Sequence, residues 1–206
     1  MNPPLRHRGR QALTSTGPTW CGCPCGTPQR EDFRGVVCPS PAPTETDLYH
    51  SALVVVTAEA SFVIEMTPIP RSGGAEGRGV VAEGPVGTKW AGRLRIFRYE
   101  IHRWRSGTIA DLSYAASPFR ITDDEAVARE VLELVPLVPT PVWGRDELGT
   151  GEMWNSNSVT AWLLVSAGLD ASASHPPDAG RVPGWDAGVA VAARRLAVRT
   201  SRSVAA

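Results

Sequence analysis

From residue 48 onward, the spacing of apolar residues predicts a series of β-strands. Residues 48–58 are rich in Val and Leu, and residues 60–67 follow after a short turn, so the two segments predict a β-hairpin. Residues 80–81 predict a short third strand. Residues 94–105 predict a longer strand, because apolar positions alternate with polar ones: Phe97, Tyr99 and Ile101 against Arg98, Glu100 and His102. This alternation indicates one buried and one wet face, so His102 is expected to face water.

Two helices are predicted after the strands. Thr122 and Glu125 have the spacing of a capping box, which predicts a helix from 122 to about 135. A second helix is predicted over 157–167, and Gly168 stands where a left-handed C-cap is needed. Residues 189–193 predict a short strand or buried turn. Early strands and later helices together predict an α+β fold, with an antiparallel sheet packed with two main helices.

The first residues differ in composition from the rest of the chain. Residues 1–46 hold all four cysteines and many prolines without any periodicity, which predicts a disordered segment. The Cys-x-Cys-x-Cys spacing at 21–25 does not fit a zinc ribbon or zinc finger, and we expect no metal or organic cofactor. The folded domain is expected over 47–195, and residues 196–206 are expected to be a disordered basic tail.

Charge and hydropathy limit the class of protein. The chain has 206 residues, 42% of them hydrophobic, with 21 basic and 21 acidic side chains. This size accommodates roughly one domain with tails. A formal charge of zero gives no electrostatic reason to expect nucleic acid or an anionic membrane as partner. No apolar run reaches the ~18–20 residues of a membrane span, and no signal-peptide core is present, so a cytoplasmic protein is expected.

A cluster of small polar residues, Asn155-Ser156-Asn157-Ser158, opens the second predicted helix directly after Trp154. The first turn of a helix has backbone N–H groups without partners and carries partial positive charge. A side-chain oxygen at this point either caps the helix or acts as a nucleophile whose developing anion the helix end stabilises. The cluster alone leaves both roles open.

Three residues, in their order along the chain, bear on the second role, that of a nucleophile. His50 lies in the first predicted strand, Glu65 at the end of the second, and Ser156 about a hundred residues later at a helix start. This order resembles the circularly permuted papain-like hydrolases of the NlpC/P60 superfamily, including the PPPDE peptidases, over about residues 48–169. The resemblance implies that His50 is the base, that Glu65 orients its imidazole, and that Ser156 stands at the family's nucleophilic cysteine.

The chain departs from that family at the nucleophile, because the cysteine is replaced by serine. A thiol ionises readily, with a free pKa of about 8.5, whereas a serine hydroxyl is a far weaker acid. His50 would therefore have to take the proton of Ser156 in the transition state. A backbone N–H at the helix start, with the amide of Asn155 or Asn157, is expected to bind the oxyanion, and Trp154 is expected to wall the cleft.

Three functions remain open at this point. The first is an amide or ester hydrolase that acts on a peptide, isopeptide, peptidoglycan-stem or lipid acyl bond with Ser156 as nucleophile. The second is a catalytically inactive binding module on the same fold. The third is an unrelated α+β domain whose polar cluster is only a helix cap. Side chains of His50 and Ser156 more than about 6–7 Å apart would count against the first two.

Overall fold

The structure is a computed structural model that describes residues 13–14, 50–69, 79–107, 120–171 and 182–204. Within these ranges six strands form one antiparallel sheet in the order β4-β5-β3-β2-β1-β6. The strands are β1 (Leu13–Thr14), β2 (Leu53–Val56), β3 (Ser61–Pro68), β4 (Val80–Pro85), β5 (Arg98–Arg105) and β6 (Arg120–Thr122). The helices are α1 (Glu125–Leu134), α2 (Ser156–Ser166) and α3 (Trp185–Val204).

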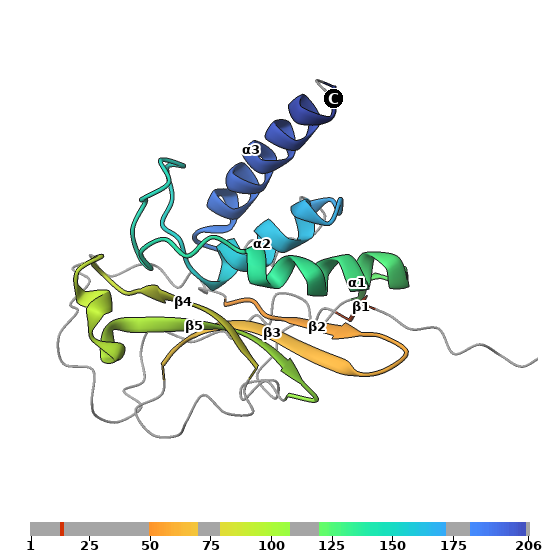
Figure 1. The fold of residues 1–206 in the computed structure, drawn as a ribbon, viewed down its shortest axis with the longest axis horizontal. Coiled ribbons are helices and arrows are strands. Elements are labelled where there is room, and N and C mark those ends of the chain that lie inside the picture. Colours follow the sequence, from red (N-terminus) through yellow and green to blue (C-terminus); the bar gives the residue numbers. More distant parts are fainter. Residues whose placement is uncertain (1–12, 15–49, 70–78, 108–119, 172–181, 205–206) are drawn as a thin grey trace, which may run out of the picture.

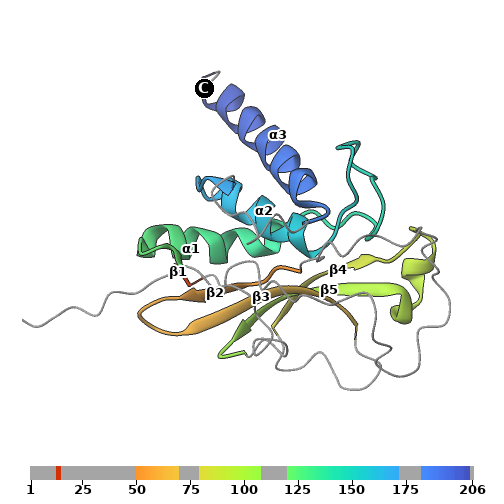
Figure 2. The same cartoon turned by 180° about the vertical axis from the view of Figure 1, so that it is seen from behind.

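The helices form layers over one face of the sheet. Helices α1 and α2 lie directly over the sheet, and α3 lies over α2 (Figures 1 and 2). The predicted α+β class with an antiparallel sheet is confirmed. Among the described helices, none combines the length and the apolar character that a membrane crossing requires.

The strand register decides which side chains face the helices. Strands β2 and β3 form the predicted hairpin, with Leu53 opposite Ile64, and β3 pairs with β5 so that Glu65 lies opposite His102. Side chains alternate between the two faces of a strand. Leu53 and Ile64 belong to the core that packs against the helices. The register therefore places Glu65 and His102 together on the opposite face of the sheet.

The expectation that His102 faces water is wrong. Its side chain is only 8% exposed, and its Nε2 lies 2.9 Å from a carboxylate oxygen of Glu100, which is fully buried. A buried polar group that has a partner avoids most of the penalty of leaving water. The alternation over 99–102 thus reflects two buried faces of β5, one apolar and one polar.

The boundaries of other elements also differ from their predicted ones. Strand β5 begins at Arg98, and the residues before it form two short 3-10 turns, η1 (Ala91–Arg93) and η2 (Arg95–Phe97). The prediction that the capping box of this helix begins at Thr122 is wrong, because the helix starts two residues later. The N-cap of α1 is Asp124, whose carboxylate accepts hydrogen bonds from the backbone N–H groups of Ala126 and Val127.

Helix α2 is the central element of the molecule. Every residue from Ser156 to Leu164 is buried, because the sheet and α1 lie on one side of it and α3 on the other. Its end follows the prediction. Gly168 has a φ of 82°, and the Leu169 N–H donates to the Leu164 carbonyl over 2.9 Å, as in a Schellman motif.

Helix α3 corrects two expectations. Residues 185–204 form one helix, so neither the strand or turn at 189–193 nor the disordered tail over 196–204 is present. Residues 205–206 lie outside the described residues. At the other end of the chain, Leu13–Thr14 pairs with β2 and β6, so these two residues are not disordered. The rest of 1–46, with its cysteines, lies outside the described residues.

Helices α2 and α3 approach closely at Gly188. A Cβ added there would lie 2.2 Å from the backbone oxygen of Ser158. We predict that Gly188→Ala lowers the free energy of unfolding by about 1–3 kcal/mol, because the two helices must move apart. Urea denaturation measures this value. Helix propensity alone gives the opposite sign, a gain of roughly 0.5–1 kcal/mol, so a stabilised variant would contradict the close contact.

Candidate functional site

The structure brings His50 and Ser156 into direct contact. The Nδ1 atom of His50 lies 2.6 Å from Oγ of Ser156, although the two residues are 106 positions apart in the chain. Ser156 is the first residue of α2 and is 5% exposed, whereas the His50 side chain is 33% exposed. The imidazole therefore lies between the buried hydroxyl and solvent.

Glu65 contacts the other nitrogen of the same imidazole. Nε2 of His50 lies 3.2 Å from Oε1 of Glu65, whose side chain is 20% exposed. An ionised carboxylate only accepts hydrogen bonds, so Nε2 carries the proton and Nδ1 is left to accept from the Ser156 hydroxyl. The arrangement is a Ser–His–Glu chain in which Nδ1 faces the serine. In the Ser–His–Asp arrangement of serine proteases Nε2 does so.

The first turn of α2 is fixed by its own polar side chains. The Asn155 side-chain oxygen accepts from the N–H groups of Asn157 and Ser158, and Ser158 Oγ accepts from the Asn155 N–H over 3.0 Å. This reciprocal capping box satisfies donors that a helix start leaves without partners. Asn155 and Ser158 thus perform the capping role, and Ser156 between them does not.

A second segment of the chain holds the same turn from outside. Oγ of Ser158 donates to the Gly184 carbonyl over 2.6 Å, and the side-chain amides of Asn155 and Asn157 donate to the Pro183 carbonyl over 2.7 and 3.0 Å. These contacts differ from the expectation that the two amides bind an oxyanion. Pro183 lies 28 residues after Asn155 and 26 after Asn157, so no local sequence pattern indicates these hydrogen bonds.

The backbone of Ser156 offers a different oxyanion donor. Asn155 caps the N–H groups of residues 157 and 158. Among the described residues, no hydrogen-bond acceptor lies on the N–H of Ser156 itself. This donor is at the positive end of α2 and belongs to the residue that carries the hydroxyl. The oxyanion of a carbonyl group that Oγ attacks would lie close to this donor.

Trp154 was expected to wall a cleft, but the structure places it in the core. It is 1% exposed and belongs to the hydrophobic core. Its backbone forms a bridge to Trp143, which in turn bridges to Val86 at the end of β4. Asp146 stabilises the loop between the two tryptophans, since its carboxylate accepts from the N–H groups of Thr150 and Gly151, which also lowers its pKa. The residues before Ser156 are therefore attached to the sheet.

The buried pair Glu100 and His102 was not singled out by sequence reasoning. The register places His102 directly opposite Glu65, so the pair lies beside the residue that contacts His50. Arg95 lies 3.8 Å from the other oxygen of Glu100. The signal that could have found the pair is the Glu-x-His spacing on one strand, which puts both side chains on the same face.

Within the ranges that the structure describes, no three His, Cys, Asp or Glu side chains gather as a metal site would require. Comparison with protein-family models, with curated proteins and with solved structures gives no match to this chain. The site is therefore interpreted from its own geometry.

We predict that His102→Ala lowers the free energy of unfolding by about 3 kcal/mol, because it removes a partner from the fully buried carboxylate of Glu100. The double variant Glu100→Gln/His102→Gln removes the buried charge and keeps hydrogen-bonding side chains, so its loss is expected to be smaller. Urea denaturation of both variants tests the idea. A double variant that is less stable than His102→Ala would show that the carboxylate does not depend on His102.

Proposed function

We propose that this protein hydrolyses an amide or ester bond with Ser156 as nucleophile, His50 as general base and acid, and Glu65 as the group that orients and stabilises the imidazole. One observation carries the proposal: a single imidazole lies 2.6 Å from a serine hydroxyl and 3.2 Å from a carboxylate through its two different nitrogens. A nucleophile within hydrogen-bond reach of a base, which a third group orients, is the arrangement that covalent catalysis needs.

The geometry supports the following reaction. As Oγ of Ser156 attacks the carbonyl carbon, its proton passes to Nδ1 of His50, and the carbonyl oxygen becomes an oxyanion. When the tetrahedral intermediate collapses, His50 returns that proton to the departing amine or alcohol, and an ester to Ser156 remains. A water molecule then gives its proton to His50 and attacks the ester carbon. The acid product and a reprotonated Ser156 result.

Two groups stabilise charge along this path. The Ser156 N–H at the positive end of α2 donates to the oxyanion. The Glu65 carboxylate lies against Nε2 and stabilises the imidazolium that exists while His50 holds the proton. Neither step needs a cofactor. We place the substrate among peptides and acyl or other amide-bearing molecules of the cytoplasm, with no role for nucleic acid, on a papain-like fold of the permuted type.

A catalytically inactive binding module on the same fold is the second candidate, and one observation favours it. Ser156 is 5% exposed, so a substrate carbonyl reaches Oγ only if a neighbouring group moves. His50 is the more exposed member of the pair, and its imidazole lies between the hydroxyl and solvent.

A fluorophosphonate probe, which reacts with activated serine hydroxyls, tests the proposal. We expect labelling at Ser156, its complete loss in Ser156→Ala, and a labelling rate roughly 10²–10⁴-fold lower in His50→Ala, because the base is removed. Mass spectrometry of the digested protein locates the label. Glu65→Gln is expected to lower the rate less than His50→Ala does, because it leaves the base in place.

Ser166→Ala is the matched control for this experiment. Ser166 lies on the same helix, is 5% exposed like Ser156, and its Oγ has no hydrogen-bond partner among the described residues. Its variant should be labelled at the wild-type rate. Wild-type protein that resists the probe, or a His50→Ala variant labelled as fast as wild type, refutes the serine mechanism.

The Ser156→Cys variant separates the two candidate functions. A thiol at a helix start beside an imidazole is expected to have a pKa well below its ordinary value, so it should react rapidly with iodoacetamide at neutral pH. The Ser166→Cys variant provides the buried thiol for comparison. A site that ignores the fluorophosphonate as serine yet becomes reactive as cysteine is a binding module that has lost its nucleophile. A thiol that stays inert in both positions contradicts activation by His50.

A further inference from the structure

The segment between β4 and β5 concentrates exposed apolar side chains. Trp90 is 72% exposed, Leu94 55%, Ile96 71% and Phe97 42%, and we call these four residues the apolar corner. Of the large apolar residues that are exposed in the described part of the chain, the other three are scattered: Leu137, Met153 and Val198. Single exposed apolar residues are ordinary, whereas four within eight positions mark an interaction surface.

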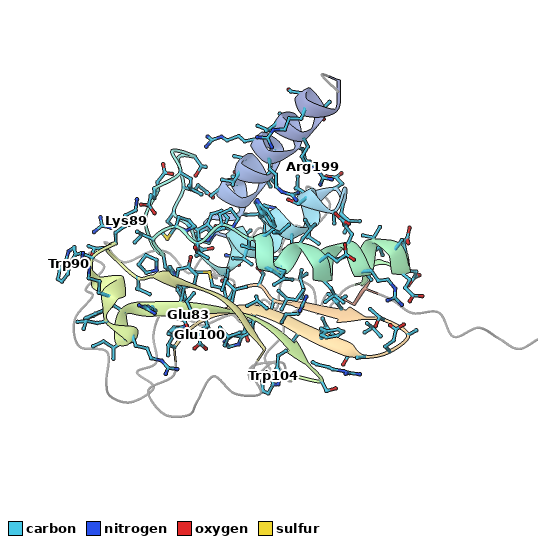
Figure 3. All side chains as sticks on the ribbon, viewed as in Figure 1. Glu83, Lys89, Trp90, Glu100, Trp104 and Arg199 are labelled. Atoms are coloured by element: carbon cyan, nitrogen blue, oxygen red, sulfur yellow. The ribbon has the colours of Figure 1, made fainter. Side chains whose placement is uncertain are left out.

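The backbone holds the apolar corner in a fixed conformation. The Leu94 N–H donates to the Ala91 carbonyl over 2.9 Å, and the Phe97 N–H donates to the Leu94 carbonyl over 3.0 Å. The Phe97 carbonyl in turn accepts from Val86 over 2.8 Å, which attaches the segment to the end of β4. Ala91 is the residue that turns inward. Trp90 projects from one end of the molecule, next to Lys89 (Figure 3).

Cations are interleaved with the apolar residues of the corner. Residues 89–98 contain one lysine and three arginines and no acidic residue: Lys89, Arg93, Arg95 and Arg98. Three of the four pair with carboxylates outside the segment: Lys89 with Glu147, Arg95 with Glu100, and Arg98 with Glu83. Within the described residues Arg93 forms no ion pair. Four cations against three carboxylates leave one net positive charge here, although the whole chain is neutral.

A charged hollow lies at the foot of the apolar corner. Its volume is about 330 Å³, and its charged lining consists of Lys89, Arg93, Arg98 and Glu83. Lys89 and Arg98 pair with Glu147 and Glu83, so the charge of Arg93 is the one left over, and it favours a small anionic group there. A phosphate within this hollow would lie beside the exposed apolar side chains. In a phospholipid, a phosphate group likewise lies beside apolar acyl chains.

We propose that residues 89–98 dock the protein on a membrane that contains anionic phospholipid. The four apolar side chains enter the boundary between headgroups and acyl chains, and the arginines contact lipid phosphates. Tryptophan favours this depth because its ring is apolar and its N–H is polar. Long cationic side chains cover apolar surface while their charges stay at the headgroups. A protein partner is less favoured, since the Lys89 side chain is 76% exposed and lysine is depleted at protein interfaces.

The docking is expected to be reversible and sensitive to salt. A single short insertion with little net charge gives weak attachment, because stable anchoring takes two independent signals. Attraction between the cations and an anionic surface decreases as ionic strength rises. The absence of a membrane-spanning helix among the described residues does not bear on this mode of binding, which needs only an inserted loop.

Flotation of the full chain with lipid vesicles tests this proposal, with phosphatidylcholine vesicles that contain or lack phosphatidylglycerol. The wild type should float with the anionic vesicles and much less with the neutral ones. Leu94→Ser should lower the partition coefficient roughly ten- to a hundredfold, because a leucine side chain no longer leaves water. The matched control is Leu137→Ser, which changes a leucine that is 58% exposed elsewhere and should bind as the wild type does.

A charge variant tests the second part of the proposal. Arg93→Gln should weaken binding to the anionic vesicles and leave the residual binding to neutral ones unchanged. Arg199→Gln, on the exposed surface of α3 (Figure 3), is its control. Wild-type protein that floats with neither vesicle, or equal losses in Leu94→Ser and Leu137→Ser, overturns the proposal. So does a dimer in sedimentation velocity that Leu94→Ser dissociates while vesicles bind nothing. None of these readouts depends on hydrolase activity.

Discussion

The start of α2 is the point on which the arrangement of the site depends. Its first turn is fixed from within by the reciprocal cap between Asn155 and Ser158, and from outside by the carbonyls of Pro183 and Gly184. The bonds to Pro183 and Gly184 join α2 to the turn that precedes α3. A buried polar group that loses its partner destabilises a protein by about 1–3 kcal/mol, so this set of bonds determines the position of the turn. Ser156, which makes none of them, is held in place by its neighbours and keeps its hydroxyl for His50.

The sheet forms the opposite side of the site, and its strand register fixes the position of Glu65 there. The hairpin of β2 and β3 has a single register, in which Leu53 and Ile64 face the helices, and a slip by one residue would turn both toward the other face. The same register fixes where Glu65 lies relative to the start of the hairpin, and therefore relative to His50. The imidazole is thus placed between a sheet residue and a helix residue, each of which is fixed by the packing of its own element.

The sequence was informative where local patterns decide the structure. The order of His50, Glu65 and Ser156 and the polar helix start were readable, and the structure brings these three residues together. Gly168 also behaves as its position at a helix end predicts. The helix start and the C-cap are interactions within one element, and few residue types suit those positions. The meeting of His50 with Ser156, 106 positions along the chain, was expected only because the order of the three residues resembles that of a known family.

Long-range contacts account for what the sequence did not reveal. Residues 189–193 resemble a strand because valines alternate there, yet Gly188 and Ala192 allow the segment to pack closely on α2 as a helix. His102 has a buried partner, and an alternating pattern does not distinguish such a partner from water. The amides of Asn155 and Asn157 meet a carbonyl far along the chain. The neutral charge of the whole chain similarly concealed a local excess of cations at 89–98.

The choice of a carboxylate as the third member of the site agrees with the choice of serine as the first. A cysteine beside a histidine exists largely as a thiolate and an imidazolium before any substrate binds, so a group that stabilises the imidazolium acts equally on the ground state and the transition state. A serine keeps its proton until it attacks, and positive charge develops on His50 only during the reaction. An interaction that strengthens only in the transition state raises the rate. Under the proposed mechanism Glu65 therefore contributes more to a serine nucleophile than it would to the cysteine that the resemblance implies, which makes Ser156 and Glu65 a chemically consistent pair.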